Sequence, residues 1–478
     1  MPWLLIPVVV FLPFVIVIVV LRTRAFVPRS RAVESTPVTV AKQRAIRHFQ
    51  QLLRIPTVSR VDESTVDWAS FDAFIAKLAE LYPRTHETLT LTRINDYGLL
   101  FHWKGARKGP ATVLMGHYDT VPADDGDWPY PPFSATLADG VIWARGTIDD
   151  KLSVAGIFEA VEATLLKGFT PEHDVYLAFG NNEETTGETA HAIAEYLHDN
   201  GVRLGLVLDE GGAVVDGGFP GVSENLAVIG VSEKGVLDVT LTAVDPGGHS
   251  STPNRGGATA RIARAISRIE AHPFPARITP PVRELMETVG RYGSTALRVV
   301  FANLWLFGPL VARLFIARGG EPAAMAHTTT VATVLRGSAA PNVLASTAQA
   351  NINVRILPGE TVTSVVARLA RVIADDQVQL SILKGNDPSP ISRTSGPVWG
   401  KVIETVEETF PDAVPTPYLM LGASDARWFA PYSATVYRFS PFRMSAEVRA
   451  TLHGSAEHLP ADAFVEGVTF YRRLITKL

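Results

Sequence analysis

The chain has 478 residues, of which 46% are apolar, and its 44 basic and 48 acidic residues give a formal charge of −4. This composition describes a folded globular protein of two or three domains and excludes disordered and collagen-like chains. It lacks the basic excess typical of nucleic-acid-binding proteins, so no nucleic-acid partner is expected, and a small uncharged or zwitterionic substrate fits better. Because the chain contains no cysteine, disulfides and thiolate metal ligands are excluded, and any metal must be held by His, Asp or Glu.

The first element in chain order is an uncharged, mostly aliphatic run from Trp3 to Leu21. Its length approaches the ~20 residues that span the hydrocarbon of a bilayer, so residues 1–22 are predicted to form one transmembrane anchor. A cleaved signal peptide is the alternative, but no Lys or Arg precedes the run, as the basic start of a signal peptide would. Four arginines follow the run, namely Arg22, Arg24, Arg29 and Arg31. The positive-inside rule then favours a cytoplasmic over an extracytoplasmic location for the rest of the chain.

A linker over residues 23–39 leads into alternating helices and strands, beginning with a predicted helix from about Val40 to Leu53. Three short apolar runs follow, of the kind that fill a parallel sheet buried on both faces: 112–115, 175–179 and 206–208. Between the first two runs, apolar residues recur at helical spacing from Val154 to Leu165. This alternation predicts an α/β sheet, whose ligands collect at the carboxyl ends of its strands.

From about Gly235 the pattern changes to a β-α-β-β-α-β order. This order predicts a ferredoxin-like domain over 235–386, inserted between two segments of the first domain, 40–234 and 387–478. Within the insertion, a second apolar stretch runs from Val299 to Ala317 and contains Arg313, Gly308 and Pro309. It is interpreted as a buried or interfacial helix, touching a membrane or a partner, rather than a second span.

Polar residues follow the predicted strands. His117 and Asp119 lie two apart after the 112–115 run, so on an extended segment they share one side. One interpretation is that His117 ligates a metal while Asp119 accepts its other ring proton; the alternative is a polar turn. Further on, Asp149 and Asp150 open a helix, where they either cap it or bridge two cations.

Two further strand ends carry acids. Glu183 and Glu184 follow the 175–179 run, and Asp209 follows the 206–208 run. Neighbouring buried carboxylates repel each other unless a cation or a proton relieves them. Acids at three successive segments, with a His-x-Asp motif at a fourth, therefore indicate a metal site.

These motifs resemble the dizinc exopeptidases that include carboxypeptidase S, bacterial glutamate carboxypeptidase, aminoacylase and succinyl-diaminopimelate desuccinylase. The matching motifs are Gly-His-Tyr-Asp-Thr-Val-Pro (116–122), Ala-Arg-Gly-Thr-Ile-Asp-Asp-Lys (144–151), Asn-Glu-Glu-Thr-Thr-Gly (182–187), Asp209, Gly-Gly-His-Ser-Ser-Thr-Pro (247–253), Asn-Val-Arg-Ile-Leu-Pro-Gly (353–359) and His453-Gly454. The resemblance extends from about residue 40 to the C-terminus and is greatest to the carboxypeptidase S branch.

The resemblance implies a zinc-exopeptidase domain with a mixed, mostly parallel sheet and an inserted ferredoxin-like α+β lid, through which a homodimer would form. It also implies two zinc ions, although Co²⁺ or Mn²⁺ suit the same donors. The implied ligands are His117, Asp149 and Asp209 for one ion, and Asp149, Glu184 and His453 for the other. Glu183 is implied as the general base that takes a proton from water and passes it to the leaving amine.

The remaining implied residues bind substrate. By the resemblance, His249 stabilises the tetrahedral oxyanion, in relatives often across a dimer. Arg355 would clamp the terminal carboxylate of the substrate, with help from Asn342. A turn near the substrate is implied for Gly422, Ser424 and Asp425.

The predicted function is hydrolysis of an amide bond beside a free carboxylate, in a dipeptide, a short peptide or an N-acyl amino acid. The apolar residues near Trp305, together with an anchor, favour fatty acyl amino acids as a hypothesis. Two alternatives stay open: an ester hydrolase that uses the same metals, and a catalytically silent, membrane-tethered binding protein. The binding protein would be favoured by a missing ligand, and no ligand position is empty.

Overall fold

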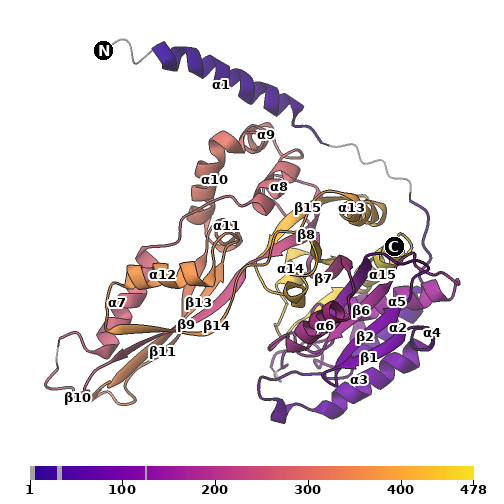
Figure 1. The fold of residues 1–478 in the computed structure, drawn as a ribbon, viewed down its shortest axis with the longest axis horizontal. Coiled ribbons are helices and arrows are strands. Elements are labelled where there is room, and N and C mark those ends of the chain that lie inside the picture. The colour runs from indigo at the N-terminus through magenta and orange to yellow at the C-terminus, as the bar shows by residue number, and fades with distance from the viewer. Residues whose placement is uncertain (1–5, 29–34, 124–125, 254) are drawn as a thin grey trace.

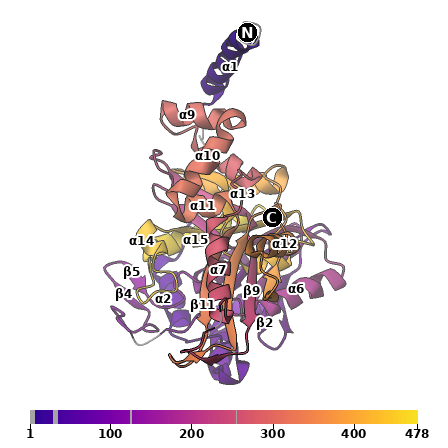
Figure 2. The ribbon, with the colours of Figure 1, turned by 90° about the vertical axis from the view of Figure 1, so that its left-hand side faces the viewer.

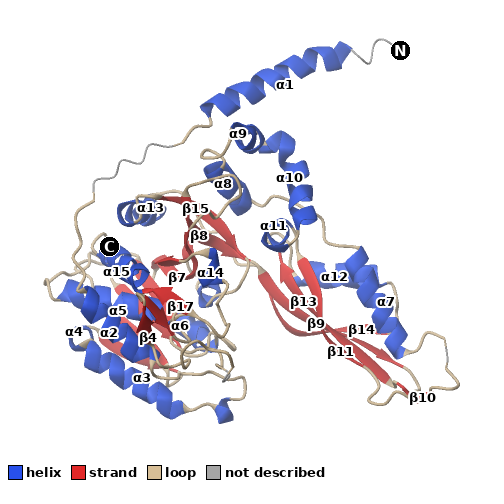
Figure 3. Ribbon diagram, turned by 180° about the vertical axis from the view of Figure 1, so that it is seen from behind, coloured by secondary structure: helices blue, strands red, loops and turns tan. Residues whose placement is uncertain are grey.

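The computed structural model describes residues 6–28, 35–123, 126–253 and 255–478. The described chain forms two large, separate sheets (Figures 1 and 3) and two short ones. The first sheet contains, from edge to edge, β1 (Thr90–Ile94), β2 (Gly98–Trp103), β6 (Val175–Gly180), β3 (Ala111–His117), β7 (Leu204–Val215), β16 (Thr435–Arg443), β8 (Asn225–Glu233) and β15 (Ala413–Met420). The central pairs β6–β3, β3–β7 and β7–β16 are parallel, which confirms the mixed, mostly parallel α/β sheet.

Helices cover both faces of the first sheet, which explains its continuous apolar strands. Every residue of β3 and of β6 is buried, as the unbroken apolar runs predicted. The helices around this sheet are α2 (Lys42–Leu53), α3 (Trp68–Leu81), α4 (Pro83–Thr88), α5 (Lys151–Leu165), α6 (Glu188–Asp199), α13 (Pro397–Thr409) and α15 (Ala461–Ile475). One core contains residues of α2, α5 and α15, and a second core on the opposite face contains residues of α6.

The second sheet has its own core and the predicted β-α-β-β-α-β order. Its strands are β11 (Thr329–Arg336), β13 (Thr347–Ile356), β9 (Gly235–Val244) and β14 (Val378–Asn386), in that spatial order. All three pairings are antiparallel. Its two helices, α7 (Ala258–Ala271) and α12 (Val362–Ile373), pack on one face around buried apolar residues. This is the ferredoxin-like arrangement.

Smaller elements complete the fold. They are two short sheets, β10 (Gly248–His249) with β12 (Val343–Leu344), and β17 (His458–Pro460) with β5 (Val141–Trp143) and β4 (Thr136–Ala138), the helix α14 (Ala446–Arg449), and the 3-10 helices η1 (Glu63–Thr65) and η2 (Asp425–Trp428). Figures 1 and 3 place β10 at the end of the second sheet that points away from the first.

Between β10 and β11 the chain makes a helical excursion, α8 (Pro280–Val289), α9 (Thr295–Ala302), α10 (Leu304–Arg318) and α11 (Gly320–Ala326). Its buried residues, such as Met286 and Val311, belong to the core of the first sheet, although the excursion lies inside the predicted 235–386 insertion. The apolar stretch from Val299 to Ala317 is thus two helices, which meet at Asn303 and differ in direction by 109°.

The N-terminal run is only partly described. Trp3 lies outside the described residues, and the run continues as α1 (Ile6–Ala25). Taken one at a time, the helices of the described residues are too short or too polar to cross a bilayer, and α9 with α10 is the one bent pair that meets the length and composition test together. The predicted single transmembrane helix is therefore not supported.

Candidate dimetal centre

The histidine and acid motifs meet at the carboxyl ends of the strands of the first sheet. His117 ends β3, and Asp149 lies two residues before α5. His117 Nε2 lies 2.8 Å from Asp149 Oδ1. The other oxygen of this carboxylate, Oδ2, lies 3.0 Å from His453 Nε2. Asp149 therefore lies between two imidazoles that are far apart in the sequence, which is the position of a bridging ligand.

Glu184 completes this group. Its Oε2 lies 3.2 Å from His453 Nε2, and His117, Asp149 and Glu184 each offer a donor atom within 4.8 Å of the others. The Glu184 side chain is only 6% exposed, and within the described residues its Oε1 has no hydrogen-bond partner. A buried carboxylate oxygen without a partner is costly, so this donor set fits a divalent cation.

Asp209 joins the group from β7, the strand beside β3. It is 2% exposed, and its Oδ2 accepts a hydrogen bond of 2.7 Å from the Ala426 amide. Burial raises the pKa of Asp209, and the nearby His117 opposes this shift. The structure thus brings all five predicted ligands to one edge of the sheet.

Asp119 connects a ligand with the glutamate pair. Its Oδ1 lies 3.3 Å from His117 Nδ1. Its two oxygens also accept hydrogen bonds from the amides of Glu183 and Glu184, at 3.2 and 3.3 Å. Because Asp119 is fully buried, it fixes both the imidazole ring and the turn that carries the two glutamates.

Glu183 lies beside the ligands in a strongly desolvated position. Desolvation raises its pKa well above the usual range, and the charges of Asp425 and Asp149 add to this shift. Burial likewise raises the pKa values of Asp150 and Glu210, which adjoin two of the ligands. So many close carboxylates are compatible only with added protons or with cations between them.

A buried ion pair outside the predicted site orders the two segments that carry Asp149 and His453. Arg145 donates to Glu457 Oε2 at 2.6 Å and to the His453 carbonyl at 3.1 Å. Glu457 Oε1 accepts from the amides of Ile148 and Asp149, at 2.7 and 3.3 Å. Sequence reasoning missed Glu457, and the only signal for it was its position four residues after His453.

The predicted substrate-binding residues do not all meet at this cluster. Ser424 is close, since its neighbour Ala426 bonds Asp209, and its own amide and hydroxyl donate to Glu233 Oε2 at 3.2 Å. Gly422 lies two residues earlier in the same turn. Next to Ser424, Asp425 is buried with both carboxylate oxygens unpaired among the described residues, and burial raises its pKa to about 8.

The other predicted substrate residues belong to the second sheet and its extension. His249 is exposed on β10, where its Nδ1 lies 2.7 Å from the Ser251 hydroxyl. Asn342 is its neighbour, because its carbonyl accepts from the Ser250 amide at 3.1 Å. Arg355 lies on β13 opposite Val236, at the base of the second sheet. The roles of these three residues therefore stay predictions. They require that the second sheet of this chain, or the second sheet of another copy of the chain, approach the metal cluster.

The chain matches known proteins over most of its length. The model of "Peptidase family M20/M25/M40" matches residues 113–477. A "Probable carboxypeptidase S-like 2" from Dictyostelium discoideum is 36% identical over 82% of this chain and 77% of its own. The human "N-fatty-acyl-amino acid synthase/hydrolase PM20D1" is 32% identical over 88% of this chain and 85% of its own.

A solved structure shares the fold. The M20 family metallo-carboxypeptidase Sso-CP2 from Sulfolobus solfataricus superposes with a TM-score of 0.67. The two sequences are 17% identical, and the match covers 90% of this chain and 98% of that one. The likeness extends across both sheets, so it supports the overall architecture.

Proposed function

Because the chain belongs to peptidase family M20/M25/M40, a family of metal-dependent hydrolases, we propose that it hydrolyses the amide bond of N-fatty-acyl amino acids. The observation that carries the reaction is the convergence of His117, Asp149 and Glu184 on one another, with Glu183 beside them. The name of the human relative supports the substrate class. A free carboxylate next to the amide is the feature that such substrates share with dipeptides.

We assign two zinc ions to the cluster, with Co²⁺ or Mn²⁺ as chemically equivalent occupants. His117, Asp149 and Asp209 would hold one ion, and Asp149, Glu184 and His453 the other. Divalent cations in such a site polarise a carbonyl oxygen and lower the pKa of a water molecule. This role fits nitrogen and oxygen donors that are buried and partly unpaired.

The protein's own groups move the proton. Water adds across the C–N bond, so the acyl carbon gains a hydroxyl group and the amine nitrogen gains a proton. Glu183, whose carboxylate lies next to the ligands, accepts the proton from water and delivers it to the leaving nitrogen, which frees a fatty acid and an amino acid.

On the substrate side, the proposal places Arg355 and Asn342 at the carboxylate of the amino acid and His249 at the carbonyl oxygen after the second sheet closes. Gly422 and Ser424 form the adjoining wall. A homodimer through the second sheet would bring His249 from the partner subunit. The association of α1 with a membrane, and the side on which the enzyme resides, belong to the same proposal.

The test is hydrolysis of a panel of N-palmitoyl amino acids, N-acetyl amino acids, dipeptides and matched esters by the zinc-loaded protein. We expect the palmitoyl substrates to have the highest kcat/KM, and Glu183→Gln to lower kcat by ~10²–10⁴-fold with the metal content unchanged. Glu188→Gln is the matched control, because Glu188 is exposed at the start of α6.

The outcomes separate the parts of the proposal. Equal or higher activity on N-acetyl amino acids would remove the fatty-acyl preference but keep the amidase. A preference for dipeptides would point to the activity in the name of the Dictyostelium relative. No amide turnover at full metal loading would overturn the reaction itself and leave the ester hydrolase or the binding protein.

A further inference from the structure

One face of α10 is apolar and exposed. Its outward residues recur along one side of the helix, at 305, 306, 309, 310, 313, 314, 317 and 318. Trp305, Leu310 and Leu314 are 48%, 54% and 58% exposed. The opposite face, which includes Leu304 and Val311, packs into the core of the first sheet. An exposed apolar surface on a helix that is packed on its other side is typical of a site that binds a membrane or another molecule.

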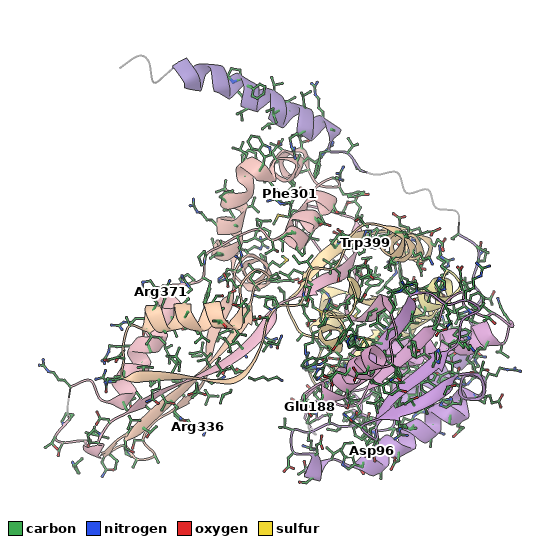
Figure 4. The ribbon with its side chains drawn as sticks, in the orientation of Figure 1. Asp96, Glu188, Phe301, Arg336, Arg371 and Trp399 are labelled. Carbon is green, nitrogen blue, oxygen red and sulfur yellow. The ribbon has the colours of Figure 1, made fainter. Side chains whose placement is uncertain are left out.

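The C-terminal end of α1 is fixed beside this face. Arg22 Nε donates to the Ala302 carbonyl at 2.9 Å, and Arg298 Nε donates to the Phe26 carbonyl at 3.0 Å. Asn303, where α9 and α10 meet, donates to the Thr23 hydroxyl at 3.3 Å. Figure 2 shows α1, α9 and α10 stacked at one end of the molecule. Figure 4 marks the same junction with Phe301.

Apolar side chains are exposed on α1 as well. Their exposed fractions range from 42% at Val20 to 61% at Phe14, and the sequence contains no polar residue from Ile6 to Leu21. A groove in a protein partner would cover only one side of α1, whereas lipid can contact all of its sides. Because α1 has no polar face and lies next to the exposed apolar face of α10, lipid is favoured over a protein partner as the molecule that covers them.

The charges along α9 and α10 are all positive. Between Thr295 and Arg318 the chain has Arg298, Arg313 and Arg318 and no acidic residue. Arg313 and Arg318 lie on the exposed face of α10, and α1 ends with Arg22 and Arg24. Arginines on and beside an exposed apolar helix face can pair with the anionic headgroups of a bilayer.

The dimensions of α10 favour a position in the plane of the bilayer surface. Its 15 residues rise ~22 Å along the axis, which is less than the ~30 Å hydrocarbon core. Its inner face is packed on protein, and α9 turns away from it by 109°. A helix held in this way cannot be enclosed by lipid, but it can bury its outer face among the headgroups and upper acyl chains.

We propose that α10, with the adjoining α1, is a membrane-docking surface that binds anionic bilayers through the exposed face of α10. This surface holds the catalytic unit at the bilayer in a fixed orientation. The proposal does not depend on the reaction that the metal cluster catalyses, and its tests need no substrate.

The first test detects contact between α10 and lipid directly. The full chain is mixed with vesicles of phosphatidylcholine and phosphatidylserine whose acyl chains carry bromine, which quenches nearby tryptophan fluorescence. We expect quenching that is smaller in Trp305→Phe than in the native chain. Trp399→Phe, a tryptophan far from α10 on α13 (Figure 4), is the control and should leave the quenching unchanged. Equal quenching in the native chain and in Trp305→Phe would overturn the proposal.

The second test measures binding by flotation with the same lipids without bromine. We expect the double variant Leu310→Glu with Leu314→Glu to lower the vesicle-bound fraction several-fold. The control is Leu335→Glu with Leu383→Glu on the second sheet, where both leucines are exposed. Arg313→Glu with Arg318→Glu should abolish the preference for phosphatidylserine over pure phosphatidylcholine vesicles.

Two results of the second test would contradict the proposal. If both leucine double variants bind vesicles equally, lipid does not contact the outer face of α10. If the α10 variants instead change the mass of the protein in solution, measured by light scattering, that face binds a second copy of the chain. Circular dichroism of each variant identifies any loss of folding, and Trp305→Phe keeps the test valid if the glutamate variants unfold.

Discussion

His453 is the predicted ligand whose backbone has a positive φ. Its φ is 58°, in the left-handed region, which is uncommon for residues other than glycine and is enriched at functional sites. The conformation is maintained from outside, because the carbonyl of His453 accepts a hydrogen bond from the buried Arg145. This contact helps to fix the segment from which the imidazole reaches Asp149 and Glu184.

Asp119 offers the most direct test of how a neighbouring residue orders the ligands. Asp119→Asn removes the negative charge next to His117 and replaces one acceptor of the glutamate amides by a donor. We expect a ~10–100-fold loss of metal affinity or of activity, measured by titration calorimetry with Zn²⁺. Asp199→Asn, at the exposed C-terminal end of α6, is the control. Unchanged metal affinity and activity in Asp119→Asn would show that His117 needs no such support.

Glu457 tests the buried ion pair. Glu457→Ala leaves Arg145 buried without its carboxylate, so we expect the free energy of unfolding to fall by ~3–5 kcal/mol, measured by urea denaturation. The exposed pair of Lys42 and Asp462 provides the control, because Asp462→Ala should cost less than ~1 kcal/mol. If the free energy of unfolding falls by a similar amount in the two variants, the buried Arg145–Glu457 pair stabilises the protein no more than an exposed pair does.

Residues with a motif were predictable, and residues that depend on tertiary contacts were not. His117, Asp149 and Glu184 lie in motifs that the sequence displays, and the structure brings them within 4.8 Å. Glu457 acts through amides and a guanidinium that come from more than 300 residues away. No local pattern encodes such a partner, so only the fold reveals it.

At the scale of elements, helix α15 packs closely on strand β16 because a glycine lies at their contact. A Cβ on Gly467 of α15 would come within 2.1 Å of the Phe442 ring. We expect Gly467→Ala to destabilise the protein by ~1–3 kcal/mol through overpacking, measured as a fall in the urea midpoint. Gly400→Ala in the exposed part of α13, where nothing lies within 4 Å of the added Cβ, should instead stabilise the protein by ~0.5–1 kcal/mol. A gain of stability in both variants would show that α15 can move away from β16 at no cost.

The elements themselves were largely predictable. The apolar runs 112–115, 175–179 and 206–208 lie within β3, β6 and β7, because strands buried on both faces leave an unbroken apolar signal. The break inside the stretch from Val299 to Ala317 was not predicted. Asn303 causes it, since its side chain donates to the Val299 carbonyl at 2.8 Å, and such local bonds compete with the helix.

At the scale of the whole molecule, the distance between the second sheet and the metal cluster raises the question of which subunit supplies His249. We expect Glu183→Gln and His249→Ala to be inactive separately and to recover activity when they are mixed after dissociation and reassociation. Random pairing would restore about a quarter of the native activity, because about half of the dimers would contain one intact site out of two. Absence of recovery, with mixed dimers shown by mass spectrometry, would place His249 at the site of its own subunit.

The position of β16 determines when the first sheet can fold during synthesis. This strand comes from residues 435–443, yet it lies inside the first sheet between β7 and β8. The second sheet, by contrast, uses only residues from one continuous stretch, so it can fold while synthesis continues. The first sheet cannot be completed until β16 has left the ribosome, when nearly the whole chain has been synthesised. His453 and Glu457 follow β16 in the sequence. A chain that ends before them therefore lacks a ligand and cannot assemble the complete metal cluster.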